Sequence, residues 1–288
     1  MTNATFTLSA FGDEIDHDLA LQLSTLRDLR VGGLELRGAW GTNVLKLSDA
    51  QVSDARKLCD EYGIKISCLG SPVGKSPILD PIEKEAANLK RLFEIGRALD
   101  TRRIRIFSFY PPDTGAQRGA NAGYDAYVEQ AAERLDRLTE LAAQADFVLL
   151  LENEKDIVTD IPERCHAVLR AINSPNLRFA WDPANFVQVG VDGPMTRGWE
   201  LLKPYIGYIH IKDAMLADGR VRPAGEGDGQ VKELLIALKD MSYRGVLALE
   251  PHLKIAGHSS GFSGVEGMTI AVNALRKLMA DTGCQETR

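Results

Sequence analysis

The stretch Tyr208-Ile-His-Ile-Lys-Asp213 predicts the end of a buried strand that runs directly into charged residues. Its apolar positions are isoleucine and tyrosine, and β-branched and aromatic side chains are typical of strands. His210 stands near the C-terminal end of this run, and a loop rich in glycine follows Asp213. The stretch therefore predicts a strand that carries a histidine to one end of a sheet.

Three other apolar runs end in the same manner. The tetrapeptides VLLL, RFAW and VLAL directly precede Glu152, Asp182 and Glu250. Together with His210, these residues follow one another at intervals of 28 to 40 positions. One strand–helix unit takes about 30 residues. Four successive strands of one parallel sheet would therefore present the four side chains at the same end of that sheet.

Strand and helix patterns alternate over the whole chain, which indicates a parallel sheet covered by helices. The predicted strands span residues 6–11, 33–37, 64–69, 104–107, 146–151, 178–181, 206–211 and 245–249. The predicted helices span residues 18–29, 48–62, 80–99, 124–145, 161–172, 195–202, 231–241 and 267–282. Eight such units close a (β/α)8 TIM barrel, and we expect one α/β domain over residues 1–288. A doubly wound open sheet is the alternative, but it spreads neighbouring strands in a line about 4.8 Å apart.

The composition is that of an ordinary globular protein, with 44% hydrophobic and 26% charged residues. A net charge of −6 argues against nucleic acid or an anionic membrane as the main partner. The four cysteines show no CxxC spacing, so we expect them to be reduced and mostly buried. The start of the sequence lacks the basic and apolar segments of a signal peptide. We therefore expect a cytoplasmic protein with a small-molecule partner, and the oligomeric state stays open.

The chemistry of Glu152, Asp182, His210 and Glu250 predicts a metal site. Three ionised carboxylates give the cluster a charge of −3, which is unfavourable in a buried place without compensation. A divalent cation supplies that compensation, and a site of oxygens with one imidazole suits Mn²⁺ or Mg²⁺, with Co²⁺ and Zn²⁺ as further options. The alternative for each residue alone is a solvated carboxylate or a core histidine. Four in register favour one bound ion, with Mn²⁺ first.

Five motifs carry a resemblance to a known group of enzymes. They are Leu151-Glu152-Asn-Glu154, Trp181-Asp-Pro-Ala-Asn185, His210-Ile-Lys-Asp213, Gly225-Glu-Gly-Asp228 and Leu249-Glu-Pro-His252. With them the chain resembles the xylose isomerase-like TIM-barrel superfamily, in particular the sugar phosphate isomerase/epimerase group, over essentially its whole length.

The resemblance implies a metal held by the four residues above, which binds two adjacent oxygens of a hydroxy-ketone or hydroxy-aldehyde. Such a metal polarises the carbonyl and stabilises an enediolate. In epimerases of this group, the residues matching Glu152 and Glu250 face each other across the substrate. One removes the proton α to the carbonyl and the other returns one. The resemblance thus predicts a divalent-metal-dependent sugar isomerase or epimerase.

One position departs from the ketose 3-epimerases of this group, which carry a histidine three residues after the metal aspartate. Here that position is Asn185, which can hydrogen-bond a substrate oxygen but cannot shuttle a proton. Dehydratases and other lyases of the superfamily begin with the same proton abstraction and are the nearest alternative. An endonuclease IV-type nuclease uses several more histidines at its strand ends, and only His210 and His252 are predicted there. A non-catalytic barrel subunit has no need of a buried cluster of carboxylates.

Lys212 is a catalytic candidate because it lies two residues after His210 on the same face of the strand, where it could stabilise an oxyanion. An ion pair with Glu226 or Asp228 is the alternative for Lys212. The candidates for substrate binding are Arg37, Asn185, His252, Glu14 and Glu154. Glu14, Glu35 and Arg37 could instead pair with one another. His252 could instead cap a helix or lie in a loop. Glu154 could instead orient a metal ligand or lie on the surface.

Two glycine-rich segments are candidates for a phosphate site. Gly225–Gly229 carries two acidic side chains that would repel a dianion. Residues 257–264 carry no acid and precede the last predicted helix, but a turn explains their composition equally well. Because no short motif forms an Arg/Lys clamp, we expect a substrate with little or no negative charge, such as a free sugar.

Overall fold

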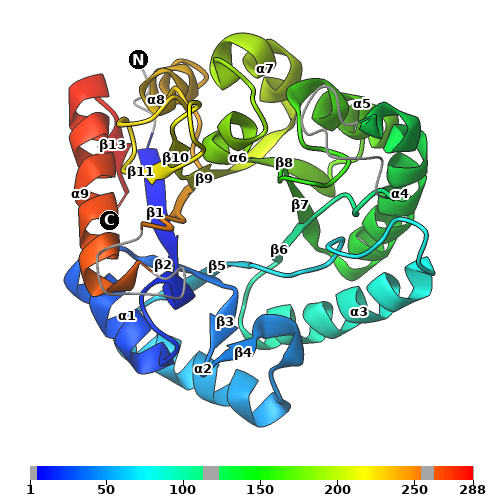
Figure 1. Cartoon of the computed structure of the whole chain (residues 1–288). Coiled ribbons are helices and arrows are strands. Elements are labelled where there is room, and N and C mark those ends of the chain that lie inside the picture. Colours follow the sequence, from blue (N-terminus) through cyan, green and yellow to red (C-terminus); the bar gives the residue numbers. More distant parts are fainter. Residues whose placement is uncertain (1–4, 113–122, 254–262, 288) are drawn as a thin grey trace.

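Eight parallel strands close into a ring with the helices outside it (Figure 1) in the computed structural model, which describes residues 5–112, 123–253 and 263–287. The strands are β1 (Thr5–Phe11), β2 (Gly33–Leu36), β5 (Lys65–Leu69), β6 (Arg103–Ile106), β7 (Val148–Glu152), β8 (Leu177–Trp181), β9 (Ile206–Ile211) and β12 (Val246–Leu249). Each pairs with its neighbour in chain order, and β12 pairs with β1 to close the ring. The predicted (β/α)8 barrel is confirmed.

Eight helices follow the predicted pattern to within a few residues. They are α1 (Leu19–Asp28), α2 (Asp49–Tyr62), α3 (Ile82–Ala98), α4 (Val128–Ala145), α5 (Pro162–Ile172), α7 (Pro194–Leu202), α8 (Val231–Asp240) and α9 (Gly264–Thr282). A ninth helix, α6 (Pro183–Gln188), was not predicted. Six residues are too few for a helical period to show in a sequence. Pro183 at its first position and the Asp182 carboxylate, which accepts the Asn185 N–H, begin this helix at a candidate metal ligand.

Short strands outside the ring were likewise not predicted. β3 (Gly38–Ala39) pairs with β4 (Thr42–Asn43), and β10 (Asp213–Ala214) pairs with β11 (Val221–Arg222), both antiparallel. β13 (Gln285–Glu286) adds to β1 beside the ring. Two-residue strands leave no alternation to detect in a sequence, because the period of a strand is itself two residues.

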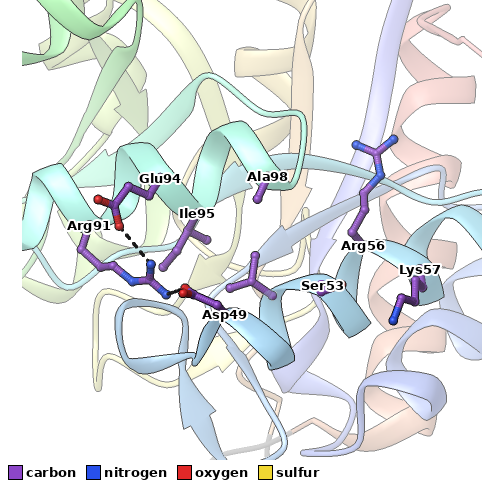
Figure 2. Close-up of a pocket in the computed structure, with 9 residues that line it drawn as sticks. Asp49, Ser53, Arg56, Lys57, Arg91, Glu94, Ile95 and Ala98 are labelled. Atoms are coloured by element: carbon purple, nitrogen blue, oxygen red, sulfur yellow. Dashed lines mark hydrogen bonds and ion pairs between the residues drawn. The ribbon is translucent and has the colours of Figure 1, made fainter.

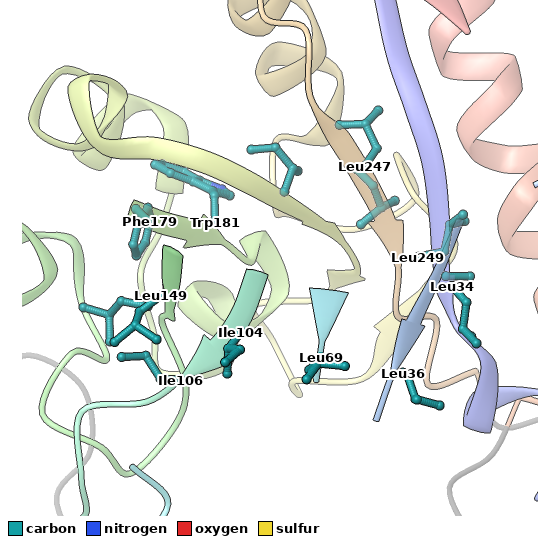
Figure 3. Close-up of a cluster of buried hydrophobic side chains, with 14 of the residues drawn as sticks. Leu34, Leu36, Leu69, Ile104, Ile106, Leu149, Phe179, Trp181, Leu247 and Leu249 are labelled. Carbon is teal, nitrogen blue, oxygen red and sulfur yellow. The ribbon is translucent and has the colours of Figure 1, made fainter. Parts of the chain in front are cut away.

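The side chains of the barrel strands divide into two sets. Those on the outer face pack against the helices in the large hydrophobic core, and Figure 3 shows Leu34, Ile104, Leu149, Phe179 and Leu247 among them. A smaller buried set forms inside the ring and consists of Cys68, Leu150, Ala180, Tyr208, Val246 and Ala248. Alternate residues of a strand share a face. The positions that follow Leu150, Ala180, Tyr208 and Ala248 by two are the four candidate metal ligands, which therefore share the inner face at the C-terminal strand ends.

No helix among the described residues combines the length and the apolar character that a bilayer span requires.

Candidate metal centre

Glu152, Asp182, His210 and Glu250 come together at the C-terminal ends of β7, β8, β9 and β12, as predicted. Each offers one ligand atom, and these four atoms lie within 4.8 Å of one another. All four residues are at most 4% exposed. Bonds from a divalent ion to oxygen or nitrogen measure about 2.0–2.4 Å, so two ligands of one ion are separated by at most roughly 4–5 Å. The spacing therefore fits a single ion.

The unsatisfied atoms of the cluster support the same conclusion. Glu152 Oε2 and Asp182 Oδ2 are buried and make no hydrogen bond of regular geometry with the described residues. Each has one cation nearby, Arg105 Nη1 at 3.4 Å and Lys212 Nζ at 2.9 Å respectively. Two cations beside three buried carboxylates leave negative charge to compensate, and the donor set of three carboxylates and one imidazole fits a divalent cation.

His210 is fixed by carboxylates on both sides. Its Nδ1 lies 2.9 Å from Glu152 Oε1, and its Nε2 lies 3.2 Å from Glu35 Oε2 on β2. The rings of Phe11 and Tyr208 meet the imidazole edge-on. Burial alone would lower the pKa of His210, but Glu152 and Glu35 outweigh it and raise the pKa well above its usual value. A carboxylate behind a ligating histidine fixes the orientation of the ring, and Glu35 is placed for that role.

Glu250 is held by cations. Arg37 Nη1 lies 2.6 Å from Glu250 Oε1, and Lys212 Nζ lies 3.0 Å from Glu250 Oε2. Burial would raise the pKa of Glu250, but Lys212, His252 and Arg37 outweigh it and lower the pKa well below its usual value. Glu250 is therefore ionised at neutral pH.

Lys212 lies inside the cluster, 2.9 Å from Asp182 Oδ2 as well as beside Glu250. The alternative prediction of an ion pair with Glu226 or Asp228 is wrong, because the Lys212 ammonium pairs with Asp182 and Glu250 instead. Burial would lower the pKa of Lys212, but Asp182 and Glu250 raise it well above its usual value. The ammonium group thus partly offsets the negative charge of the ligands.

Asp182 is positioned through its backbone by a residue that the sequence did not single out. Asn153 Nδ2 donates to Asp182 O at 2.8 Å, and Asp182 N donates to Asn153 Oδ1 at 2.9 Å. Burial, together with Glu152 and Glu250, raises the pKa of Asp182 although Lys212 opposes the change. Asn153 directly follows Glu152 in the chain, so one short segment serves two ligands.

Arg105 on β6 is a second residue that the sequence did not single out. It is 5% exposed, its Nη1 lies 3.4 Å from Glu152 Oε2, and its Nη2 donates to the carbonyl oxygens of Gly70 and Ser71. Burial would raise the pKa of Glu152, but His210 and Arg105 lower it. The signal was the alternation in Arg103-Ile-Arg-Ile106, which puts Arg105 on the inner face of a buried strand.

Asn185 is fully buried beside the ligands. Its Nδ2 donates to Asn153 O at 2.9 Å and approaches Glu152 Oε1 at 3.4 Å, and its Oδ1 accepts from Lys155. These contacts hold Glu152 and the start of α6. A contact between Asn185 and the substrate stays a prediction.

Glu14, Arg37 and His252 form a network around Glu250. Arg37 also pairs with Asp13 at 2.8 Å and with Glu14 at 2.7 Å, and His252 Nδ1 lies 2.8 Å from Glu14. Burial would lower the pKa of His252, but Glu250 and Glu14 raise it to about 9. The predicted pairing of Glu14 with Arg37 is confirmed, whereas the Glu35 carboxylate contacts His210 rather than Arg37. The proposed substrate contacts of the three residues remain predictions.

Glu154 pairs with Lys75 at 3.0 Å and with Lys155 at 2.9 Å at the edge of the cluster. Burial would raise its pKa, but Lys212, Lys75 and Lys155 lower it. It contacts lysines rather than a metal ligand among the described residues. A role for Glu154 in substrate binding is still a prediction.

The segment Gly225–Gly229 encloses a side chain of the protein itself. The Asp213 carboxylate accepts the backbone N–H groups of Gly225, Gly227 and Gly229 at 2.9 to 3.0 Å. These donors are therefore not available to a phosphate. The other phosphate candidate, residues 257–264, lies largely outside the described residues; Ser263, which is described, donates to Glu14 Oε2.

The sequence and the fold are similar to those of known proteins. The model of the xylose isomerase-like TIM barrel family matches residues 25–278. A 3-dehydroshikimate dehydratase of Bacillus anthracis is 24% identical over 189 residues, which span 65% of this chain and 63% of that relative. The crystal structure of the probable 3-DHS dehydratase AsbF from Bacillus anthracis aligns with a TM-score of 0.70 and 18% identity, covering 94% of this chain and 98% of the other.

A D-psicose 3-epimerase of Clostridium cellulolyticum H10 aligns with a TM-score of 0.71 and 15% identity, covering 97% of this chain and all of the other. At such identities these two structures support the fold alone. The match of the family model over most of the sequence shows more. The chain belongs to the xylose isomerase-like TIM barrel family.

Proposed function

We propose that the protein is a divalent-metal-dependent isomerase or epimerase of a sugar or sugar derivative, which acts by removing a proton α to a carbonyl. The observation that carries the proposal is a pair of buried carboxylates, Glu152 and Glu250, on either side of the possible metal ligands Asp182 and His210. A divalent ion held by these four residues would polarise the substrate carbonyl and stabilise negative charge on its oxygens.

Glu152 and Glu250 are the proposed bases. Both carboxylates are held ionised by neighbouring cations, as their lowered pKa values indicate. Glu152 Oε2 makes no hydrogen bond of regular geometry with the described residues, although Arg105 Nη1 lies 3.4 Å away, and it could accept a proton from one face of the substrate. In an epimerisation Glu250, which is ionised before the reaction, would take up a proton from water and deliver it to the opposite face. Lys212, whose ammonium group lies between Asp182 and Glu250, would donate a hydrogen bond to the oxygen that becomes negative.

The second candidate is a dehydratase, and two observations favour it. The relative with 24% identity is a 3-dehydroshikimate dehydratase, and Asn185 cannot exchange a proton with the substrate. In that reaction a glutamate removes the α-proton, the bond between the β-carbon and its hydroxyl breaks, and the hydroxyl leaves as water after protonation. Lys212 and His252 are the cationic groups placed to supply that proton.

One experiment tests the shared step and separates the two candidates. Keto-sugars, cyclitol ketones and keto-acids are incubated in D₂O with the protein and Mn²⁺ and followed by NMR. Deuterium at the α-carbon with an altered configuration supports the isomerase or epimerase, and formation of an alkene supports the dehydratase. Exchange that persists unchanged in Glu152→Gln and Glu250→Gln would contradict the assignment of the bases.

Metal content is measured separately by elemental analysis. The proposal expects about one ion per chain, lost in Asp182→Asn. Three ions per chain would favour the nuclease alternative, and none would favour a binding subunit.

A further inference from the structure

A cavity of about 850 Å³ opens at the end of the barrel opposite the metal centre. It is lined by residues near the starts of β1, β2, β5, β6 and β12 and by residues at or just after the C-terminal ends of α1, α2 and α3. The candidate metal ligands lie at the C-terminal strand ends, whereas this cavity lies at the N-terminal strand ends. Small-molecule sites commonly enclose roughly 300–1,000 Å³, so the cavity has the size of a ligand site.

The lining is basic although the protein is acidic. Its charged residues are two aspartates, Asp60 and Asp100, and six cations, Arg27, Arg30, Arg56, Lys65, Arg103 and Arg244. Their sum is +4, in a chain whose net charge is −6. Positive charge gathered around a cavity raises the local concentration of anions.

Most of this charge is not neutralised within the protein. Both aspartates pair with one cation, Arg56, at 2.8 and 3.9 Å. Arg27 Nε lies 3.8 Å from Asp28 Oδ1, and the Arg27 guanidinium stacks over the Tyr62 ring at 4.8 Å. The other four cations have no acidic partner in the part of the chain that the structure describes; they are Arg30, Lys65, Arg103 and Arg244.

A second cavity provides the contrast. It measures about 340 Å³ and lies between α2 and α3, where Figure 2 shows Arg91 between Asp49 and Glu94. Arg91 pairs there with Asp49 at 2.7 Å and with Glu94 at 3.0 Å. In that cavity the arginine that could meet an anion is already engaged by two carboxylates. Four cations of the larger cavity, Arg30, Lys65, Arg103 and Arg244, differ in lacking such partners among the described residues.

The larger cavity also reaches into the barrel. Ser67 lines it, and the Ser67 hydroxyl lies 2.7 Å from Ser9 Oγ and 2.9 Å from the buried Tyr208 hydroxyl. Burial raises the pKa of the inner residue Cys68, and Arg103 is close enough for its charge to oppose part of that rise. The cations therefore surround a recess with a polar floor rather than a flat surface.

We propose that this cavity binds a small phosphate-bearing anion at a site separate from the metal centre. Guanidinium groups present planar, paired N–H donors that match phosphate oxygens. Three of the four unpaired cations are arginines, from the turn after α1, from β6 and from the turn before β12. Lys65 adds a fourth charge from β5. The proposal does not depend on the reaction at the other end of the barrel.

The experiment uses inorganic pyrophosphate as the probe and isothermal titration calorimetry at low salt, with the whole chain and with metal removed by chelation and dialysis. The wild type is expected to bind one pyrophosphate per chain. Arg103→Gln and Arg244→Gln are each expected to weaken binding about tenfold, and higher salt is expected to weaken it further. Circular dichroism and thermal unfolding establish that each variant is folded.

Arg170→Gln is the matched control, because Arg170 is an exposed arginine of α5 that does not line the cavity. It is expected to bind pyrophosphate like the wild type. Absence of saturable binding by the wild type would overturn the proposal. Equal losses in Arg170→Gln and Arg103→Gln, or binding of citrate as tight as that of pyrophosphate, would overturn it as well.

Discussion

Glu152 and Glu250 are both buried carboxylates at strand ends, but different neighbours hold them. Glu152 faces His210 and Arg105, whereas Glu250 faces Lys212, Arg37 and His252. In each case the nearby cations outweigh burial and lower the pKa of the carboxyl group. Both are therefore available as proton acceptors at neutral pH, which is the property that the proposed reaction requires.

Glu152→Gln and Glu250→Gln are each expected to reduce turnover by about 10²–10⁴-fold, because a glutamine cannot accept the α-proton. The rates are measured with metal in excess, so that weaker metal binding does not limit them. Glu233→Gln, on the exposed surface of α8, is the control and is expected to leave turnover unchanged. Near wild-type turnover in either site variant would remove that residue from the mechanism.

Glu35 acts on the metal site through His210, because its carboxylate lies 3.2 Å from His210 Nε2. Glu35→Gln is expected to weaken metal affinity by about 10–100-fold, the usual effect of losing such a partner. The measurement is a competition titration with a metal chelator, which needs no substrate. Unchanged affinity would show that Glu35 does not help to orient His210.

Metal binding is expected to depend on pH, because the metal replaces a proton on His210. Glu152 and Glu35 raise the pKa of His210, so the metal-free imidazole carries that proton over the neutral range. A metal ligand must be deprotonated. Affinity is therefore expected to rise by about tenfold per pH unit below the raised pKa, and to fall as the pH decreases. Calorimetry in buffers of different ionisation enthalpy counts the proton released, and release of none would contradict the prediction.

The loop after β9 is held together by hydrogen bonds to the Asp213 carboxylate. Its carboxylate accepts backbone N–H groups from Gly225, Gly227 and Gly229, as well as from Ala214. These hydrogen bonds hold the segment between β10 and α8 next to the end of β9, which carries His210 and is followed by Lys212. The glycines are required because a Cβ on Gly229 would lie 2.7 Å from Asp213 Oδ1.

Asp213→Asn is expected to lower the free energy of unfolding by about 1–3 kcal/mol, because an amide NH₂ would face donors that lose their acceptor. Urea denaturation measures the change. Asp192→Asn, at an exposed position, is the matched control and is expected to change the free energy by less than about 0.5 kcal/mol. Equal stability of the two variants would mean that the loop does not rely on the carboxylate.

The candidate metal ligands come from four adjacent strands of the ring. The order β12-β9-β8-β7 places Glu250, His210, Asp182 and Glu152 on consecutive strands. An ion bound by all four would link these strands at one end. A ligand that binds only the folded state stabilises it, by about 2.7 kcal/mol at a concentration 100 times its dissociation constant.

Saturating Mn²⁺ is therefore expected to raise the melting temperature by on the order of 5–10 °C relative to the protein treated with a chelator. Scanning calorimetry measures the shift. It is expected to disappear in Asp182→Asn and to persist in Glu133→Gln, whose side chain is exposed on α4. A shift of the same size in both variants would mean that the ion binds elsewhere.

The barrel and the four candidate ligands could be predicted from patterns in the sequence. The alternation of strand and helix patterns indicated the fold class, and strand ends spaced by about one strand–helix unit put Glu152, Asp182, His210 and Glu250 at one end of the sheet. Such local periods depend only on neighbouring residues, so they can be followed along the chain. The helix α6 escaped detection because it is shorter than two helical turns.

The side chains that surround those ligands could not be predicted, because they come from distant parts of the chain. Glu35 meets His210 across 175 positions of the sequence, and Arg37 meets Glu250 across 213. Lys212 pairs with Asp182 and Glu250 rather than with Glu226 or Asp228, which follow it in the chain. The basic cavity likewise gathers the ends of five strands and three helices. Contacts of this kind depend on the register and closure of the barrel, and no local period of the sequence encodes the distance between opposite strands.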